Sequence, residues 1–166
     1  MLTISLDLFA QDKILGRYRD YFGSRIQLNS DNTFKYTSNF DMSSSWTKGT
    51  WTIMNDTVFL HMVPTYDTLR QTNKYGLAID TLLLSPDELS ERLTQTQLPG
   101  DLSVSNGQII YAQLSAGGQN RMDYPDKLVS KKGRLYRIKN GKLIIKKQIG
   151  FWTGKKWDPW FFKSDD

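Results

Sequence analysis

Apolar and polar residues alternate in two consecutive segments, 26–36 and 49–62, and in each segment the alternation keeps its register across a turn. Successive side chains of a β-strand point to opposite faces, so this pattern predicts two antiparallel hairpins, each with one apolar face. The first hairpin fits a three-residue loop in which Asn32 takes a left-handed conformation. The second hairpin fits a two-residue turn at 55–56.

A third hairpin is predicted around Asn140-Gly141, because both residues accept a positive φ. Its register places four apolar side chains on a predicted core face: Tyr136, Ile138, Leu143 and Ile145. The opposite face then carries four cationic side chains: Arg137, Lys139, Lys142 and Lys146. Like charges that face each other across two strands are destabilising, so this face is expected to be hydrated or to meet an anion.

The remaining chain predicts further strands at 77–85, 108–114 and 158–163, and one short helix at 86–93. The helix is indicated by Ser85 as N-cap, followed by a proline at the first helical position. Residues 1–13 allow two interpretations. Strict alternation of leucine or isoleucine with polar residues predicts an N-terminal strand, whereas the small residue near a plausible cleavage point fits a signal-peptide remnant.

Eight to ten short strands joined by tight turns predict an all-β protein. Because sequential strands are joined by hairpins, we expect an antiparallel meander that closes into a β-barrel, with a β-sandwich as the alternative closure. The sequence shows no internal repeat, linker or domain boundary. We therefore expect residues 14–166 to form a single domain.

Part of this pattern resembles a known family. The residues concerned are Gly16-x-Tyr18, Leu28-x-x-Asp31-x-Thr33-Phe34-x-Tyr36, Gly49-Thr50-Trp51 and Val58-Phe59-Leu60. They resemble the small lipocalin-like domains of bacterial envelope proteins, which belong to the calycin-type barrels, over residues 14–63. The resemblance implies a lipocalin-like β-barrel that binds a small apolar ligand or an envelope protein partner. An exported (periplasmic or secreted) location would fit the signal-peptide interpretation of residues 1–13, but the sequence alone leaves the location open. In lipocalins the Gly-x-Trp motif lies on the first barrel strand, so the later position of Gly49 means that no binding residue carries over.

Large side chains that face the inside of the predicted barrel are the candidates for contact with an apolar ligand. Trp46 is a separate case, because it follows a run of three serines and is expected at a barrel mouth. The predicted ligand-binding residues are Phe34, Tyr36, Trp46, Trp51, Leu60 and Tyr136. The alternative is that these side chains are ordinary core, in which case the barrel is filled and the domain is structural.

Positive charge is concentrated toward the C-terminal end. The net charge is +5, but residues 121–166 carry thirteen Lys or Arg and five Asp or Glu, whereas residues 1–120 carry nine and twelve. This excess predicts an alternative function, a module that binds a polyanion (nucleic acid or anionic lipid) through residues 131–156. The predicted anion-binding residues are Lys139, Lys142 and Lys146. A solvated lysine-rich sheet face is the simpler interpretation of the same charges.

The sequence offers little for catalysis. It has no cysteine and one histidine, His61, which excludes disulfides, thiol chemistry and sites that need two imidazoles. No segment approaches the roughly 18 consecutive apolar residues of a transmembrane helix. We predict a non-enzymatic protein without a cofactor or metal, whose partner is a small hydrophobic ligand or another protein, with nucleic acid less favoured.

Overall fold

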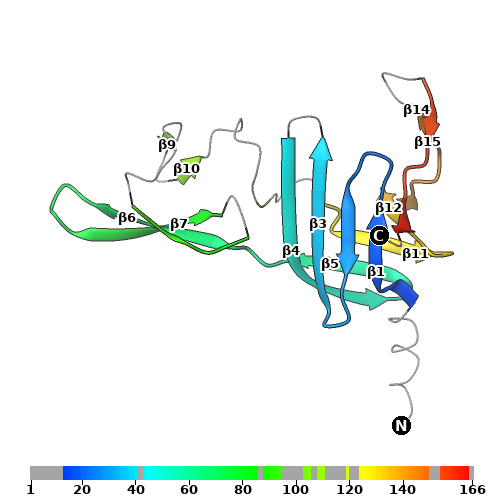
Figure 1. Cartoon of the computed structure of the whole chain (residues 1–166), viewed down its shortest axis with the longest axis horizontal. Coiled ribbons are helices and arrows are strands. Elements are labelled where there is room, and N and C mark those ends of the chain that lie inside the picture. The colour runs from blue at the N-terminus through cyan, green and yellow to red at the C-terminus, as the bar shows by residue number, and fades with distance from the viewer. Residues whose placement is uncertain are drawn as a thin grey trace, which may run out of the picture.

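The structure is a computed structural model in which a closed barrel carries a separate, elongated sheet (Figure 1). The described residues are 13–40, 43–85, 88–94, 103–105, 108–110, 119, 124–149 and 154–164. Nearly all regular structure in them is β. Lys13 and Ile14 are the only described residues that belong to a helix. The two interpretations of the N-terminal segment fall on residues 1–12, which lie outside the described part.

Eight strands form the barrel, and each pairs antiparallel with its neighbour in chain order. They are β1 (Gly16–Arg19), β2 (Arg25–Leu28), β3 (Thr33–Phe40), β4 (Ser43–Met54), β5 (Thr57–Met62), β11 (Lys127–Lys131), β12 (Arg134–Lys139) and β16 (Phe161–Ser164). The ring closes because β11 pairs with both β5 and β12, while β16 pairs with both β12 and β1. The predicted all-β fold, a meander closing into a lipocalin-like barrel, is confirmed.

The first two hairpins have the predicted registers. Leu28 lies opposite Phe34, and Asn32 in the loop has a φ of 63°. Trp51 lies opposite Leu60, across a turn whose two residues also have positive φ values. The alternation predicts the register of these hairpins correctly because each strand has one face in the core. A slip of one residue would expose every apolar side chain.

The barrel interior is packed with side chains. Twelve of them form one cluster, and each is at most 4% exposed: Ile14, Tyr18, Ile26, Leu28, Phe34, Tyr36, Trp51, Val58, Leu60, Leu128, Leu135 and Phe161. Trp51 also donates its indole N–H to the carbonyl of Asn29 at 3.1 Å. Gly49 is required where β4 approaches β5, since a Cβ there would lie 1.9 Å from the carbonyl oxygen of His61. The side chain of His61 faces away from the core, as predicted.

The predicted faces of the third hairpin are wrong. Its turn and the pairing of Ile138 with Leu143 are confirmed, but Arg137 lies opposite the fully buried Leu128 and therefore faces inward. Tyr136 consequently lies on the outer face of β12, where it packs against Trp160 and is 8% exposed, and Ile145 is 63% exposed. The reason is that β12 also pairs with β11 and β16, and the apolar residues of those strands decide which face of β12 is buried.

A three-stranded sheet is inserted between β5 and β11 and extends away from the barrel as an arm (Figure 1). It contains β6 (Tyr66–Thr72), β7 (Ala78–Leu84) and β8 (Arg92–Thr94), in the order β7-β6-β8. The strand predicted at 77–85 is confirmed as β7, whereas β6 is an element that the sequence pattern did not predict.

The helix predicted at 86–93 is not formed in its described part. Residues 88–91 are not helical, and β8 begins at Arg92 and pairs parallel with β6. The signals that predicted the helix serve tertiary contacts instead. The hydroxyl of Ser85 donates to the carbonyl of Leu89 at 2.7 Å, and the amide of Glu91 donates to a carboxylate oxygen of Asp67 at 2.9 Å. Pairing with β6 prevails over the local helix signal.

The other described strands are short. They are β9 (Ser103–Ser105), β10 (Gln108–Ile110), β13 (Lys142–Leu143), β14 (Gln148–Ile149) and β15 (Lys156–Trp157). Strand β10 covers the beginning of the strand predicted at 108–114; residues 111–114 lie outside the described part. Strand β16 confirms that the C-terminal segment closes the sheet, and it begins two residues after Pro159, which cannot donate to a strand ladder.

Candidate anion-binding face of the barrel

The eight barrel strands contain eleven basic residues and no Asp or Glu. The basic residues are Arg17, Arg19, Arg25, Lys35, Lys48, Lys127, Lys131, Arg134, Arg137, Lys139 and Lys163. In a chain with 17 acidic residues, every carboxylate side chain is thus excluded from these strands. The wall of the barrel is consequently a cationic surface.

Strand register arranges the outward-facing residues of β1 to β4, β12 and β16 in two rows, and about half of the positions in these rows are cationic. The first row runs across neighbouring strands through Arg134, Phe162, Arg19, Arg25, Thr37 and Trp46. The second runs through Ser164, Arg17, Gln27, Lys35 and Lys48. These positions face outward because the residues that alternate with them, such as Tyr18 and Tyr36, are core. We call Arg17, Arg19, Arg25, Lys35, Lys48 and Arg134 the cationic face.

Two pairs of like charges lie directly opposite each other on this face. Arg19 is opposite Arg25, and Lys35 is opposite Lys48. Side chains in such positions have Cβ atoms about 5 Å apart, and like charges there are destabilising. An anion placed between two such side chains would remove this repulsion. The arrangement is therefore better suited to an anion-bound state than to a bare surface.

One of these two cation pairs already binds an acidic residue of the chain itself. Glu88, in the loop before β8, forms an ion pair with Lys35, and its backbone carbonyl accepts a hydrogen bond from Lys48 Nζ at 3.0 Å. Both side chains of the ion pair are 43% exposed. One acidic residue of the arm thus occupies one of the two cation pairs.

A groove of about 330 Å³ lies over β1, β2 and β3. It is lined by Arg17, Arg19, Arg25 and Lys35, with Gln27 and Thr37 as neutral hydrogen-bonding groups between them. Guanidinium groups present several donors in a planar fork that matches phosphate and carboxylate oxygens. The chemistry of the groove is that of an anion site.

Aromatic rings lie beneath three of the cations. The guanidinium of Arg19 is 5.1 Å from the ring centre of Phe162, and that of Arg134 is 5.0 Å from the ring centre of Trp160. Lys48 Nζ lies 5.7 Å from the ring of Trp46. Such cation–π contacts hold a cation in a fixed position over the ring.

The predicted ligand-binding residues do not gather at one site. Phe34, Tyr36, Trp51 and Leu60 belong to the packed interior. Of the two others, only Tyr136 was expected to face inward, and it lies instead on the outer face of β12; Trp46 and Tyr136 are each 8% exposed. Trp46 lies on the outer row of β4, where its backbone forms a bridge with Gln119, and Tyr136 packs outside β12 with its ring 5.4 Å from that of Trp160.

A second groove, of about 620 Å³, lies on the outside of β12 and β13. Its lining residues are Lys131, Lys132, Arg134, Tyr136, Lys142, Leu143 and Ile145. Of the three predicted anion-binding lysines, Lys142 lines this groove and Lys139 is its cross-strand partner. Lys146 is exposed and is not among the lining residues. Arg134 joins this groove to the cationic face.

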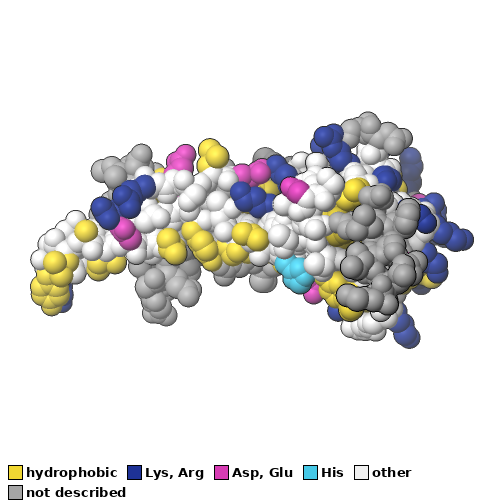
Figure 2. Space-filling view, turned by 90° about the horizontal axis from the view of Figure 1, so that it is seen from below, with side chains coloured by type: hydrophobic (Ala, Val, Ile, Leu, Met, Phe, Trp, Pro, Cys, Tyr) yellow, Lys and Arg dark blue, Asp and Glu magenta, His cyan; other side chains and the backbone are white. Residues whose placement is uncertain are grey.

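Sequence reasoning missed Arg17, Arg19 and Arg25, which belong to a stretch that is acidic when its charges are counted together. The signal was present in the alternation. Each of these arginines is directly adjacent in sequence to an apolar or aromatic core residue, Tyr18 or Ile26, so the strand period alone places all three on the outer surface. Figure 2 shows Lys and Arg side chains around the barrel end of the molecule and also on the arm, along which a line of hydrophobic side chains runs.

No family model, curated protein or solved structure matches the chain. Within the described residues, no helix is both long and apolar enough to cross a bilayer. The same residues contain no cluster of three or more His, Asp or Glu side chains that could hold a metal ion.

Proposed function

We propose that the chain is a non-enzymatic binding domain that binds a polyanion on the cationic face of its barrel. The observation that carries the proposal is the exclusion of acidic residues from all eight barrel strands, together with the two outer rows of cations. Arginine and lysine contacts with phosphates release condensed counterions, and this supplies affinity without sequence recognition. The site differs from the C-terminal segment that charge counting favoured, because it is centred on β1, β2 and β3.

The barrel interior has no part in this proposal. Four of the six residues expected to contact an apolar ligand are at most 2% exposed and pack against one another or against neighbouring core residues. A filled barrel serves instead as a rigid support, since side chains that alternate with the cations are fixed in the core. The lipocalin-like architecture then presents its ligand-binding surface on the outside.

The proposal is tested by the fluorescence anisotropy of a labelled single-stranded oligonucleotide, which is titrated with protein at salt concentrations from about 50 to about 200 mM. Replacing Arg19 and Arg25 together by Gln removes two phosphate contacts. We expect a loss of about tenfold or more in affinity at the lowest salt, and a salt slope shallower by about 1.4, which is roughly 0.7 for each contact.

The matched control is the double variant Lys74→Gln/Lys127→Gln, which removes two exposed cations outside the cationic face. It changes the net charge by the same amount, so we expect a much smaller effect on affinity. An equal loss in both double variants would show that only net charge matters. Absence of binding by the unmodified protein at low salt would reject the proposed function.

A further inference from the structure

Two large aromatic side chains are exposed at the turn that joins the two arginine-bearing strands. Tyr21 is 55% exposed and Phe22 is 41% exposed. The turn connects Arg19, at the end of β1, with Arg25, at the start of β2. Exposed rings are therefore placed directly beside the cation pair that faces across these strands.

The two rings form a cluster with Trp157 of β15. The rings of Tyr21 and Trp157 are nearly parallel, with an interplanar angle of 12° and a centre-to-centre distance of 5.9 Å. Phe22 lies edge-on to Trp157, with ring centres 4.2 Å apart. We call these three residues the aromatic platform. The three rings pack against one another, which keeps the exposed rings of Tyr21 and Phe22 from turning toward the core.

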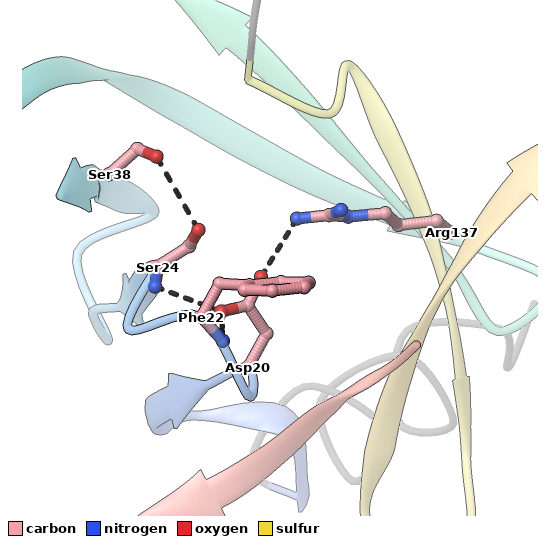
Figure 3. A network of polar contacts seen from close by, with 5 residues as sticks. All are labelled: Asp20, Phe22, Ser24, Ser38 and Arg137. Carbon is pink, nitrogen blue, oxygen red and sulfur yellow. Dashed lines mark hydrogen bonds and ion pairs between the residues drawn. The ribbon is translucent and has the colours of Figure 1, made fainter. Parts of the chain in front are cut away.

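The turn that carries the platform is held by a buried carboxylate (Figure 3). Asp20 is only 6% exposed. One of its carboxylate oxygens accepts hydrogen bonds from the amides of Phe22 and Ser24, both at 2.9 Å. The other accepts a hydrogen bond at 3.0 Å from Arg137, which reaches across from β12. A turn fixed in this way loses little conformational entropy when a ligand binds to it.

We infer that the aromatic platform stacks an unpaired nucleobase, so that the polyanion bound by this barrel is single-stranded nucleic acid. This inference rests on the proposed function and adds the ligand class. Every base has a flat π-face, and stacking on aromatic side chains beside phosphate-binding cations is how proteins bind single strands without sequence preference. A duplex keeps its bases stacked inside the double helix, so these bases cannot stack on the platform.

A single strand fits the shape of the site better than an anionic membrane does. The cations follow rows around a curved wall, from β12 through β16 and β1 to β2, so a flat surface would reach few of them at once. A flexible chain can follow the rows, with its phosphates on the arginines and a base turned onto the platform.

The test compares four probes by anisotropy and intrinsic tryptophan fluorescence. They are a short oligothymidylate, an abasic oligomer of the same length and charge, a duplex of equal length, and phosphatidylserine vesicles. We expect the oligothymidylate to bind about tenfold tighter than the abasic oligomer, since each stacked base contributes affinity. In the Tyr21→Ala/Phe22→Ala variant this preference disappears, while affinity for the abasic oligomer is unchanged.

Tyr75→Ala is the matched control, because Tyr75 is an aromatic residue at the tip of the arm that is 75% exposed. It should leave the preference intact. Equal affinity of the unmodified protein for the base-bearing and abasic oligomers would overturn the inference while leaving polyanion binding in place. Tighter binding to the duplex, or aromatic-dependent binding to vesicles alone, would also overturn it. No binding to any of the four probes would reject the proposed function itself.

Discussion

Tyr18 is a polar residue inside the barrel core. It is 1% exposed, and its hydroxyl donates to the carbonyl of Ile14 at 2.9 Å. Burial disfavours the phenolate and raises the pKa of Tyr18 to about 12. The core can hold this hydroxyl because Ile14, two residues before β1, supplies an acceptor. The same arrangement makes the barrel sensitive to high pH.

The free energy of unfolding should therefore fall above pH 10. The folded pKa of Tyr18 lies above the value of about 10 for an unfolded chain. Its contribution is fully present below pH 10 and is lost as pH rises toward 12, by about 1.4 kcal/mol for each pH unit. Urea unfolding at pH 8, 10 and 11 measures this loss. The Tyr18→Phe variant should lack it, whereas Tyr75→Phe should retain it. Parallel pH profiles for the unmodified protein and Tyr18→Phe would contradict the account.

Individual residues also show where sequence patterns stop being informative. The alternation in the first two hairpins places Phe34 and Trp51 in the core, and the structure agrees. The same reasoning gave Arg137 the wrong face, because a tight turn determines which residues pair but not which side of the pair is buried. That choice depends on Leu128 and Phe161, which come from other strands.

At the scale of elements, local turn chemistry was sufficient where both strands of a hairpin are adjacent in sequence. Asn32 and Asn140 take the positive φ values that their turns require. The predicted helix failed because its start signal is local, whereas β8 forms by pairing with β6, more than twenty residues away. Strand β6 carries polar residues at most positions, so its alternation gives a weak signal.

The loop before β8 leads to a prediction about how the arm affects binding. Glu88 pairs with Lys35 and therefore occupies part of the cationic face. Replacing Glu88 by Gln removes a competing carboxylate, and affinity for a single-stranded oligonucleotide should rise. Exposed ion pairs contribute up to about 1 kcal/mol, which corresponds to a gain of about two- to fivefold. Anisotropy at low salt measures it.

Glu91→Gln is the control for that experiment, since Glu91 is exposed in the same loop and its backbone amide, rather than its carboxylate, makes the contact with Asp67. The variant changes the net charge equally. If both variants raise the affinity to the same extent, the effect is one of overall charge. An unchanged affinity in Glu88→Gln would mean that the ligand does not reach Lys35.

At the scale of the whole molecule, the barrel could be predicted but its charged surface could not. Counting charges by sequence segment placed the positive charge after residue 120. Such counts do not distinguish residues on the outer face of the barrel from residues in loops. Closure of the barrel brings β16 next to β1, so that Phe162, from the basic C-terminal end, joins the row that contains Arg19 and Arg25. The charges become one surface only when strand order and register are known.

The most direct test of this account is a map of the binding surface. The amide resonances of ¹⁵N-labelled protein would be followed by NMR during titration with an unlabelled single-stranded oligonucleotide at low salt. The account predicts that the largest shifts fall in β1, β2, the turn between them and β16, with smaller changes in β3. Shifts confined to the arm, to residues 139–146, or to core residues such as Trp51 and Leu60 would contradict it.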